Sequence, residues 1–150
     1  MILLNWRHMS GKMSRNKGRR LEYLVRDLAR KAGFQADRVP LSGASQGFKG
    51  DVRISKYGKT YIIECKSRSA GFSSIYDLYH QDASGIYVEG RCYRIMTDLE
   101  AMIDMRGLYL ILKPPVKGLK KLMGLEKLLQ GADFLAIKDN NRPILYVRYG

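Results

Sequence analysis

The chain has 150 residues, enough for one domain with a substantial buried core. Hydrophobic residues make up 45% of it, which excludes a disordered basic tail, and no apolar run approaches the roughly 20 residues that a bilayer span needs. Lysine and arginine total 27 against 14 aspartates and glutamates, so the formal net charge is +13. Such a charge indicates an anionic partner, with nucleic acid the first candidate and an anionic membrane surface the second.

The N-terminal part combines a basic segment with a helix. Residues 14–20 are basic and small, and we interpret them as an arm along a phosphate backbone, with residues 1–16 flexible; a solvated tail is the alternative. Apolar residues then recur at helical spacing, which predicts a helix from Gly18 to Ala32 that Gly33 ends. Its predicted apolar face consists of Leu21, Leu24, Val25, Leu28 and Ala32.

Glu22 lies on this predicted helix, roughly 90° from the centre of the apolar face at about 100° per residue. It therefore falls at the edge of the buried stripe, beside Ala29, where a carboxylate can face a neighbouring strand. Periodicity alone, however, favours an ordinary surface glutamate.

A strand, a loop and a β-hairpin are predicted next. Residues 34–40 predict a strand that Pro40 ends, and the Ser/Gly-rich residues 41–50 predict a long loop of a kind that is often functional. Two apolar runs joined by a turn, residues 51–55 and 59–66, predict the hairpin.

Alternation along the second run of this hairpin separates its side chains into two sets. Glu64 and Lys66 share one face, while Ile63 and Cys65 share the other, which we expect to pack against helices. Asp51 opens the first run, so its carboxylate is predicted at the same end of the hairpin as that of Glu64.

The C-terminal half predicts further helices and strands in one domain, residues 1–150, without repeat or linker. Ser73 or Ser74 is expected to cap the first of these helices, and Thr97 the second. The expected helices span residues 73–83, 97–105 and 116–129, and the expected strands span residues 86–88, 91–96, 108–112, 134–138 and 144–149.

The cysteines and histidines do not suggest a zinc site. Cys65 and Cys92 cannot bind zinc alone, and His8 and His80 are not at ligand spacing from them. We predict both cysteines to be reduced core residues of a cytoplasmic protein without a small-molecule cofactor. Residues 1–8 are too short an apolar stretch for a secretory signal.

Carboxylates next to a lysine at strand ends suit metal-dependent phosphodiester cleavage. Asp51 and Glu64 supply oxygen ligands, which favour Mg²⁺, or Mn²⁺ as a substitute, over zinc. Lys66 supplies a cation that can orient water or stabilise developing negative charge. Glu64-Cys65-Lys66 alone is a common tripeptide, so the prediction depends on the surrounding order of elements.

That order resembles the PD-(D/E)xK nuclease superfamily, and within it the archaeal-type (Hjc-like) Holliday junction resolvases and their phage-encoded relatives. The resemblance covers residues 16–68: a helix with Glu22, a strand, a Ser/Gly loop, Asp51, and a strand ending in Glu64-Cys65-Lys66. It implies an α/β, restriction-endonuclease-like core, a central mixed β-sheet flanked by helices. Gly50 stands where the family usually has proline, and residues 85–113 would be an insertion.

The resemblance also implies roles for individual residues. The implied metal ligands are Asp51, Glu64 and the Cys65 backbone carbonyl, with Glu22 holding a metal or its water. The implied catalytic residues are Glu22, Asp51, Glu64, Lys66 and Ser42, the last on a loop that approaches the scissile strand. The implied DNA-binding residues are Arg15, Lys17, Arg19, Arg20, Arg38, Lys49, Arg53 and Arg68.

The resulting prediction is a Mg²⁺-dependent endonuclease that resolves four-way DNA junctions in a bacterial, archaeal or phage-infected cell. Two symmetric cuts require two active sites, so we expect a homodimer. One alternative is a nuclease of the same fold that acts in repair or restriction on duplex or flap DNA. A non-catalytic nucleic-acid-binding protein of this fold, or a basic RNA-associated protein, is the other.

Overall fold

The structure is a computed structural model. It describes residues 6–39, 51–69, 71–80, 85–88, 90–104, 109–111, 117–129 and 131–150, and for residues 6–17, 88, 109–111 and 117 only the backbone. The residues predicted as the Ser/Gly-rich loop, which include Ser42 and Lys49, lie outside this part of the chain. None of the helices in the described part is long and apolar enough to cross a membrane.

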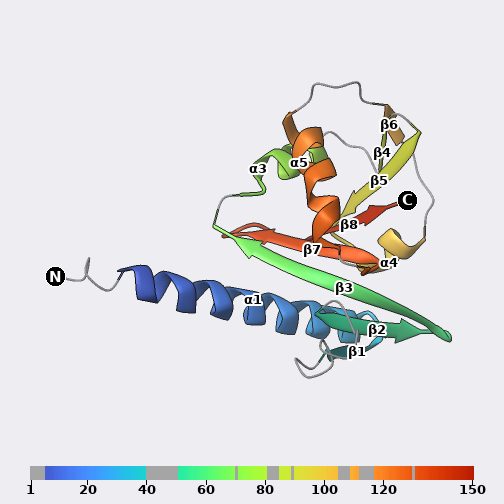
Figure 1. The fold of residues 1–150 in the computed structure, drawn as a ribbon. Helices are drawn as coiled ribbons and strands as arrows, with labels where there is room; N and C mark the ends of the chain where they lie inside the picture. The colour runs from blue at the N-terminus through green and yellow to red at the C-terminus, as the bar shows by residue number, and fades with distance from the viewer. Residues whose placement is uncertain are drawn as a thin grey trace.

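A mixed β-sheet of eight strands runs through the described residues, in the order β1-β2-β3-β7-β8-β5-β4-β6 (Figure 1). β3 pairs with β7, and β4 with β6, in parallel; the other neighbouring strands are antiparallel. The predicted mixed sheet is therefore confirmed. The strands are β1 (Gln35–Arg38), β2 (Val52–Lys56), β3 (Lys59–Arg68), β4 (Gly85–Val88), β5 (Arg91–Met96), β6 (Tyr109–Ile111), β7 (Phe134–Asp139) and β8 (Leu145–Tyr149).

The predicted hairpin is formed by β2 and β3, with Val52 opposite Ile63 and Lys56 opposite Lys59. Its two turn residues, Tyr57 and Gly58, have φ angles of 53° and 76°. Positive φ at both positions matches the right-handed twist of paired strands, so the turn is tight and fixes the register.

Helices cover both faces of the sheet, as Figure 1 shows. α1 lies on the face of β1, β2 and β3, and α4 lies on the same face, in one apolar cluster with it. α3 and α5 pack together on the opposite face. The helices are α1 (Trp6–Lys31), α3 (Ser73–Tyr79), α4 (Leu99–Ile103) and α5 (Lys117–Leu125), followed by the 3₁₀ turn η2 (Glu126–Leu128).

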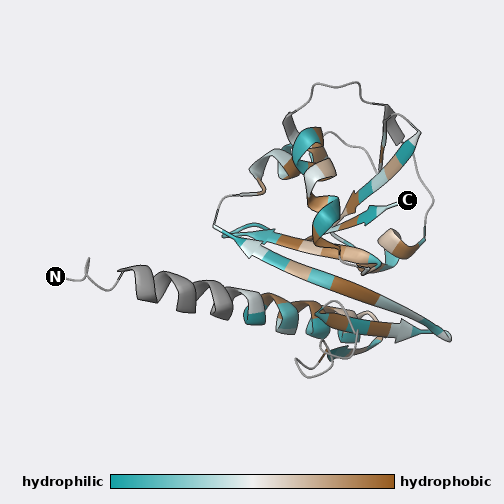
Figure 2. Ribbon diagram, viewed as in Figure 1, coloured by the Kyte–Doolittle hydropathy of each residue, from teal (hydrophilic) through white to brown (hydrophobic). Residues whose placement is uncertain are grey.

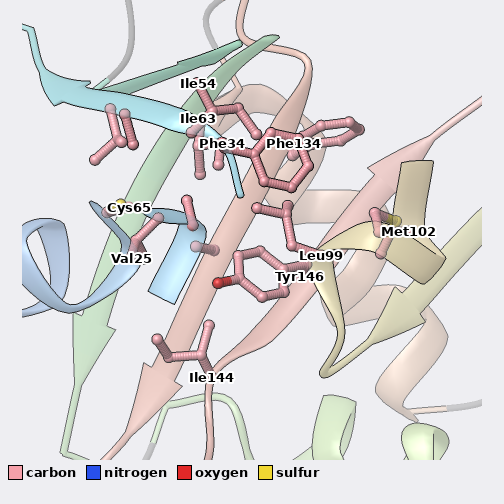
Figure 3. Packing of buried hydrophobic residues seen from close by; sticks show 14 of the residues in the cluster. Val25, Phe34, Ile54, Ile63, Cys65, Leu99, Met102, Phe134, Ile144 and Tyr146 are labelled. Carbon is pink, nitrogen blue, oxygen red and sulfur yellow. The ribbon is translucent and has the colours of Figure 1, made fainter. Parts of the chain in front are cut away.

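The alternation predicted for β3 is confirmed by the two apolar clusters. Ile63 and Cys65 are buried with Val25 of α1 in one cluster (Figure 3). Leu135 of β7, which pairs with Glu64, is buried in the other cluster, with α3 and α5. Glu64 therefore lies on the α3–α5 face, as does Lys66. Hydrophobic residues fill the middle of β3 and β7, and the arrowhead ends of both strands are hydrophilic (Figure 2).

α1 differs from its prediction at its start and on its apolar face. It begins at Trp6 rather than Gly18, so residues 14–20 belong to the helix. Extending a helix that is already packed adds a hydrogen bond for each residue without a new nucleation cost. Leu24 and Leu28, predicted as core, are 39% and 41% exposed, because the helix meets the sheet along a narrower stripe: Leu21, Val25 and Ala29.

The C-terminal helices also differ from the predictions in their ends. α3 ends at Tyr79, and Phe72 precedes it without a side-chain cap, so neither Ser73 nor Ser74 has the predicted role. α4 is capped by Asp98, whose carboxylate accepts the N–H groups of Glu100 and Ala101, rather than by Thr97. Residues 85–113, expected as an insertion, contribute β4, β5, α4 and β6, so this segment extends the sheet beyond β8.

Candidate active site

The candidate site lies where β2 starts and β3 continues alone. β2 begins at Val52, opposite Ile63, so residues 64–68 of β3 pair with β7 on one side and have no β2 residue on the other. Asp51 lies at this open edge: its N–H donates to the carbonyl of Ile63 at 2.9 Å. Its Oδ2 accepts the N–H of Cys65 at 2.8 Å. The carboxylate of Asp51 is thus held against β3 where strand pairing ends.

Glu64 lies beside Asp51 and is buried, at 6% exposure. Lys66 Nζ is 3.6 Å from Glu64 Oε1, as expected for side chains two residues apart on one strand face. Burial, and then the charge of Asp51, raise the pKa of the Glu64 carboxyl to about 7, although Lys66 lowers it. Two neighbouring carboxylates with a single lysine leave an excess of negative charge in a largely buried place, which a bound cation would compensate.

Glu22 approaches the same edge from α1. Its side chain is 16% exposed, and Arg38 Nε donates to its Oε1 at 3.3 Å. The pKa of Glu22 is raised, first by burial and then by the charge of Asp51, while Arg38 lowers it. Glu22 is therefore part of an acidic group with Asp51, and the surface position that periodicity favoured is wrong.

Tyr23 orients Arg38 in this arrangement. Arg38 Nη1 donates to the Tyr23 hydroxyl at 3.0 Å. The guanidinium also lies over the Tyr23 ring, 4.5 Å from its centroid. A guanidinium held on two sides in this way presents a fixed donor to Glu22. Sequence reasoning did not identify Tyr23, because nothing in the helical spacing links it to a residue of β1.

The donor set at the open edge fits a hard divalent cation. Asp51 and Glu64 supply carboxylate oxygens. The Cys65 carbonyl points toward Asp51, because the N–H and C=O of one strand residue point the same way and its N–H bonds Asp51. Oxygen ligands of this kind favour Mg²⁺ or Mn²⁺. Within the described residues, no three His, Cys, Asp or Glu side chains gather at metal-binding spacing, so the set depends on that backbone oxygen.

The Cys65 sulfur does not belong to this donor set. Cys65 is buried in the apolar cluster under α1, on the face of β3 opposite Glu64. Burial, and then the charges of Asp51, Glu22 and Glu64, raise the pKa of its thiol well above the usual value. A neutral thiol that faces the core is a poor metal ligand, which argues against a zinc–thiolate site.

Comparison with known proteins places the chain in a family. Residues 13–88 match the family model described as "Archaeal holliday junction resolvase (hjc)", which is half of the chain. The chain belongs to this family of Holliday junction resolvases. As a family, these resolvases are nucleases that bind branched DNA, and the mixed α/β sheet described above is consistent with their restriction-endonuclease-like fold. The matched range contains Glu22, Asp51, Glu64 and Lys66.

A phage protein is also similar to part of this resolvase-family chain. "Protein D14" of Escherichia phage T5 is 49% identical over an alignment of 55 residues, and the match covers 29% of this chain and 34% of the phage protein. The chain therefore spans about a third of the length of that relative.

The predicted DNA-binding residues of this resolvase-family chain that the structure describes fall into three groups. Arg15, Lys17, Arg19 and Arg20 lie on α1, and the last two are exposed. Arg19 is close enough to Glu22 for its charge to lower the pKa of that carboxyl. Arg53 and Arg68 are exposed on β2 and β3, whereas Arg38 is engaged by Glu22 and Tyr23.

Proposed function

We propose that this chain is a metal-dependent endonuclease that resolves four-way DNA junctions by paired phosphodiester cleavage. The observation that supports it most is the convergence of Asp51, Glu64 and Lys66 at the open edge of β3. A protein that only bound DNA would gain nothing from two carboxylates placed together, because they repel the phosphates that its +13 net charge attracts.

Each residue has a distinct part in this proposal. Asp51, Glu64 and the Cys65 carbonyl would hold Mg²⁺, or Mn²⁺ in its place. The bound ion supplies an activated water and neutralises charge on the phosphate. Lys66, next to Glu64, stabilises negative charge that develops on the phosphate oxygens. Glu22 would help to hold the metal or its water, and Arg38 orients Glu22.

The same proposal includes a homodimer. Resolution of a junction needs two cuts on opposite strands, and a two-fold axis supplies two equivalent sites for them. Arg19 and Arg20 are exposed on α1, with Arg19 near Glu22, and both would contact the backbone of the strand to be cut. Such contacts position the substrate without reading its sequence.

The test is cleavage of a four-way junction and of a duplex of equal sequence, with nicks mapped on all four strands. With Mg²⁺, the wild-type protein should give paired, symmetric nicks in the junction and leave the duplex intact. Asp37→Asn, a change at an exposed carboxylate of β1, is the matched control and should cut normally. Scattered cuts in the duplex arms would instead indicate a general nuclease. If the protein cuts with neither Mg²⁺ nor Mn²⁺, the proposed endonuclease activity is disproved.

A further inference from the structure

A basic groove lies between α3 and α5, on the face of the sheet that carries Glu64. It has a volume of about 620 Å³. We call it the α3–α5 groove. Its lining includes Arg68 and Ser74 on one side and Lys120, Lys121, Gly124 and Lys127 on the other.

Close packing of the two helices builds this groove. A β-carbon at Gly118 would collide with the carbonyl oxygen of Ser74 and lie 2.7 Å from Cγ of Leu78, so only glycine allows α5 to approach α3 so closely. Leu122, Leu119 and Leu125 are buried beneath α5. The lysines on its outer side are therefore carried by a helix that cannot shift easily.

Arg68 is held in place on the opposite wall. A β-carbon at Gly71 would lie 2.6 Å from Cδ of Arg68, so the arginine stem occupies the space that glycine leaves. Its guanidinium is 5.6 Å from the centroid of the Phe72 ring. Arg68 is thus ordered at the groove before any partner arrives, which reduces the entropy cost of binding an anion.

The basic side chains of the groove form no ion pairs in the described part of the chain. Among the described residues, none of the ion pairs includes Arg68, Lys120, Lys121 or Lys127. Glu126, the acid next to Lys127 in the chain, pairs with Arg91 at 2.8 Å instead. Like charges gathered on a fixed surface repel one another, so an anionic partner would stabilise them.

The groove continues directly from the candidate active site. Arg68 shares a strand face with Glu64 and Lys66, and two residues of strand separate it from Lys66 by about 7 Å. Lys120 and Lys121 of α5 and Lys127 of η2 carry the positive charge along about 11 Å of helix. α5 lies outside residues 13–88, so the lysine side of the groove is outside the part that matches the family, whereas Arg68 and Ser74 are within it.

We propose that the α3–α5 groove binds the sugar–phosphate backbone of a DNA duplex arm beside the scissile phosphate. This rests on the nuclease function proposed above. The lysines and Arg68 would neutralise successive phosphates and hold the arm in line with Glu64 and Lys66. Such contacts are independent of sequence and depend on salt.

The test is equilibrium binding of a four-way junction over a range of salt concentrations. Lys120→Gln/Lys127→Gln should weaken binding about tenfold or more at low salt, and lower the log–log salt slope by about 2, one for each lost phosphate contact. The control is the double variant Lys31→Gln/Lys59→Gln, which removes the same charge from exposed residues at the C-terminal end of α1 and the N-terminal end of β3. It should change the salt slope far less. Equal effects of the two pairs would overturn the proposal, because they would reflect net charge alone.

A second pair of variants tests the groove at one position. A β-carbon at Gly124 would meet nothing within 4 Å, so a larger side chain fits there without moving the helix. Gly124→Glu places a negative charge among the lysines and should weaken junction binding about tenfold, whereas Gly124→Ala should bind like the wild type. If both variants bind equally, no phosphate lies in the groove.

A cleavage assay distinguishes a failure of this groove proposal from a failure of the proposed nuclease function. At saturating junction, the groove variants should still cut, because Asp51, Glu64 and Lys66 are unchanged. If the wild type binds junctions but never cuts them, the nuclease function fails while the salt slopes still test the groove. If the groove variants lose affinity for anionic vesicles but not for DNA, the partner named here is wrong.

Discussion

Asp51 and Cys65 are joined across the open end of the hairpin, since the Cys65 N–H donates a 2.8 Å hydrogen bond to Oδ2 of Asp51. Because β2 starts at Val52, none of its backbone carbonyls accepts this N–H of β3. The carboxylate of Asp51 accepts it instead. Asp51 therefore completes the strand pairing and also supplies charge next to Glu64. Substitutions can separate these two contributions.

Asp51→Asn and Asp51→Ala should both abolish cleavage but differ in stability. Either change removes a carboxylate from the metal set, and we expect a rate loss of about 100-fold or more. Asparagine keeps an oxygen that accepts the Cys65 N–H, so its free energy of unfolding should match or exceed that of the wild type. Alanine leaves this N–H without its acceptor, at a cost of about 1–3 kcal/mol. Urea unfolding without metal measures the difference, and equal midpoints for the two variants would contradict the structural part assigned to Asp51.

Glu64 should make the metal-free protein less stable as the pH rises. Its folded pKa of about 7 lies above the usual 4.5 of the unfolded chain, so the unfolded state loses the proton first. The protonated carboxyl therefore contributes stability that is full below pH 4.5 and lost as the pH rises through about 7. Glu64→Gln cannot ionise and should be more stable than the wild type at pH 8, by about 1–3 kcal/mol.

The measurement is urea unfolding in chelator at pH 4.5, 6 and 8. The difference between Glu64→Gln and the wild type should grow with pH. Glu126→Gln, a change at an acid paired with Arg91 at the surface, is the control and should show no such growth. A constant difference between Glu64→Gln and the wild type would mean that Glu64 is already ionised at low pH.

Mg²⁺ should stabilise the wild type through the same carboxylates. A ligand that binds the folded state alone raises the midpoint of thermal unfolding, and a concentration of about 100 times the dissociation constant adds about 2.7 kcal/mol. At pH 8 we expect an upward shift of several degrees for the wild type and for Asp37→Asn, and little or none for Asp51→Asn or Glu64→Gln. This readout does not depend on activity. Equal shifts in all four proteins would place the bound ion elsewhere.

The hairpin could be predicted from the sequence because all of its signals are local. Two apolar runs with alternating side chains flank Tyr57-Gly58, and this fixes the register and therefore the shared face of Glu64 and Lys66. The relation of Asp51 to that face follows from the same short segment. These residues are adjacent in space because they are near one another in the chain.

Relations between distant segments could not be derived in this way. Helical spacing gives the angle of Glu22 around α1, but not which strand end it meets, so the resemblance alone distinguished it from a surface residue. Leu24 and Leu28 fit an apolar stripe, yet the width of the contact with the sheet decides that they are exposed. The α3–α5 groove joins Arg68 to Lys120, more than fifty residues later, and no local pattern links them.

Arg38 should act through Glu22 rather than through DNA. The sequence prediction made it a backbone contact, whereas its guanidinium donates to Glu22 at 3.3 Å and to Tyr23 at 3.0 Å. Arg38→Gln should therefore slow cleavage at saturating junction about tenfold, as expected when a ligand-orienting partner is lost, and change the dissociation constant of the junction by less than about threefold. Single-turnover cleavage and equilibrium binding measure the two quantities separately.

Arg26→Gln is the matched control for this change. Arg26 lies over the same Tyr23 ring, at 4.8 Å from its centroid, but pairs with Asp27 instead of Glu22. The Arg26→Gln variant should therefore cut at a rate close to that of the wild type. If Arg38→Gln raises the dissociation constant as much as it lowers the rate, Arg38 contacts DNA and the sequence prediction is right. If Arg26→Gln slows cleavage as much as Arg38→Gln does, the contact with the Tyr23 ring, and not the contact with Glu22, accounts for the slower cleavage.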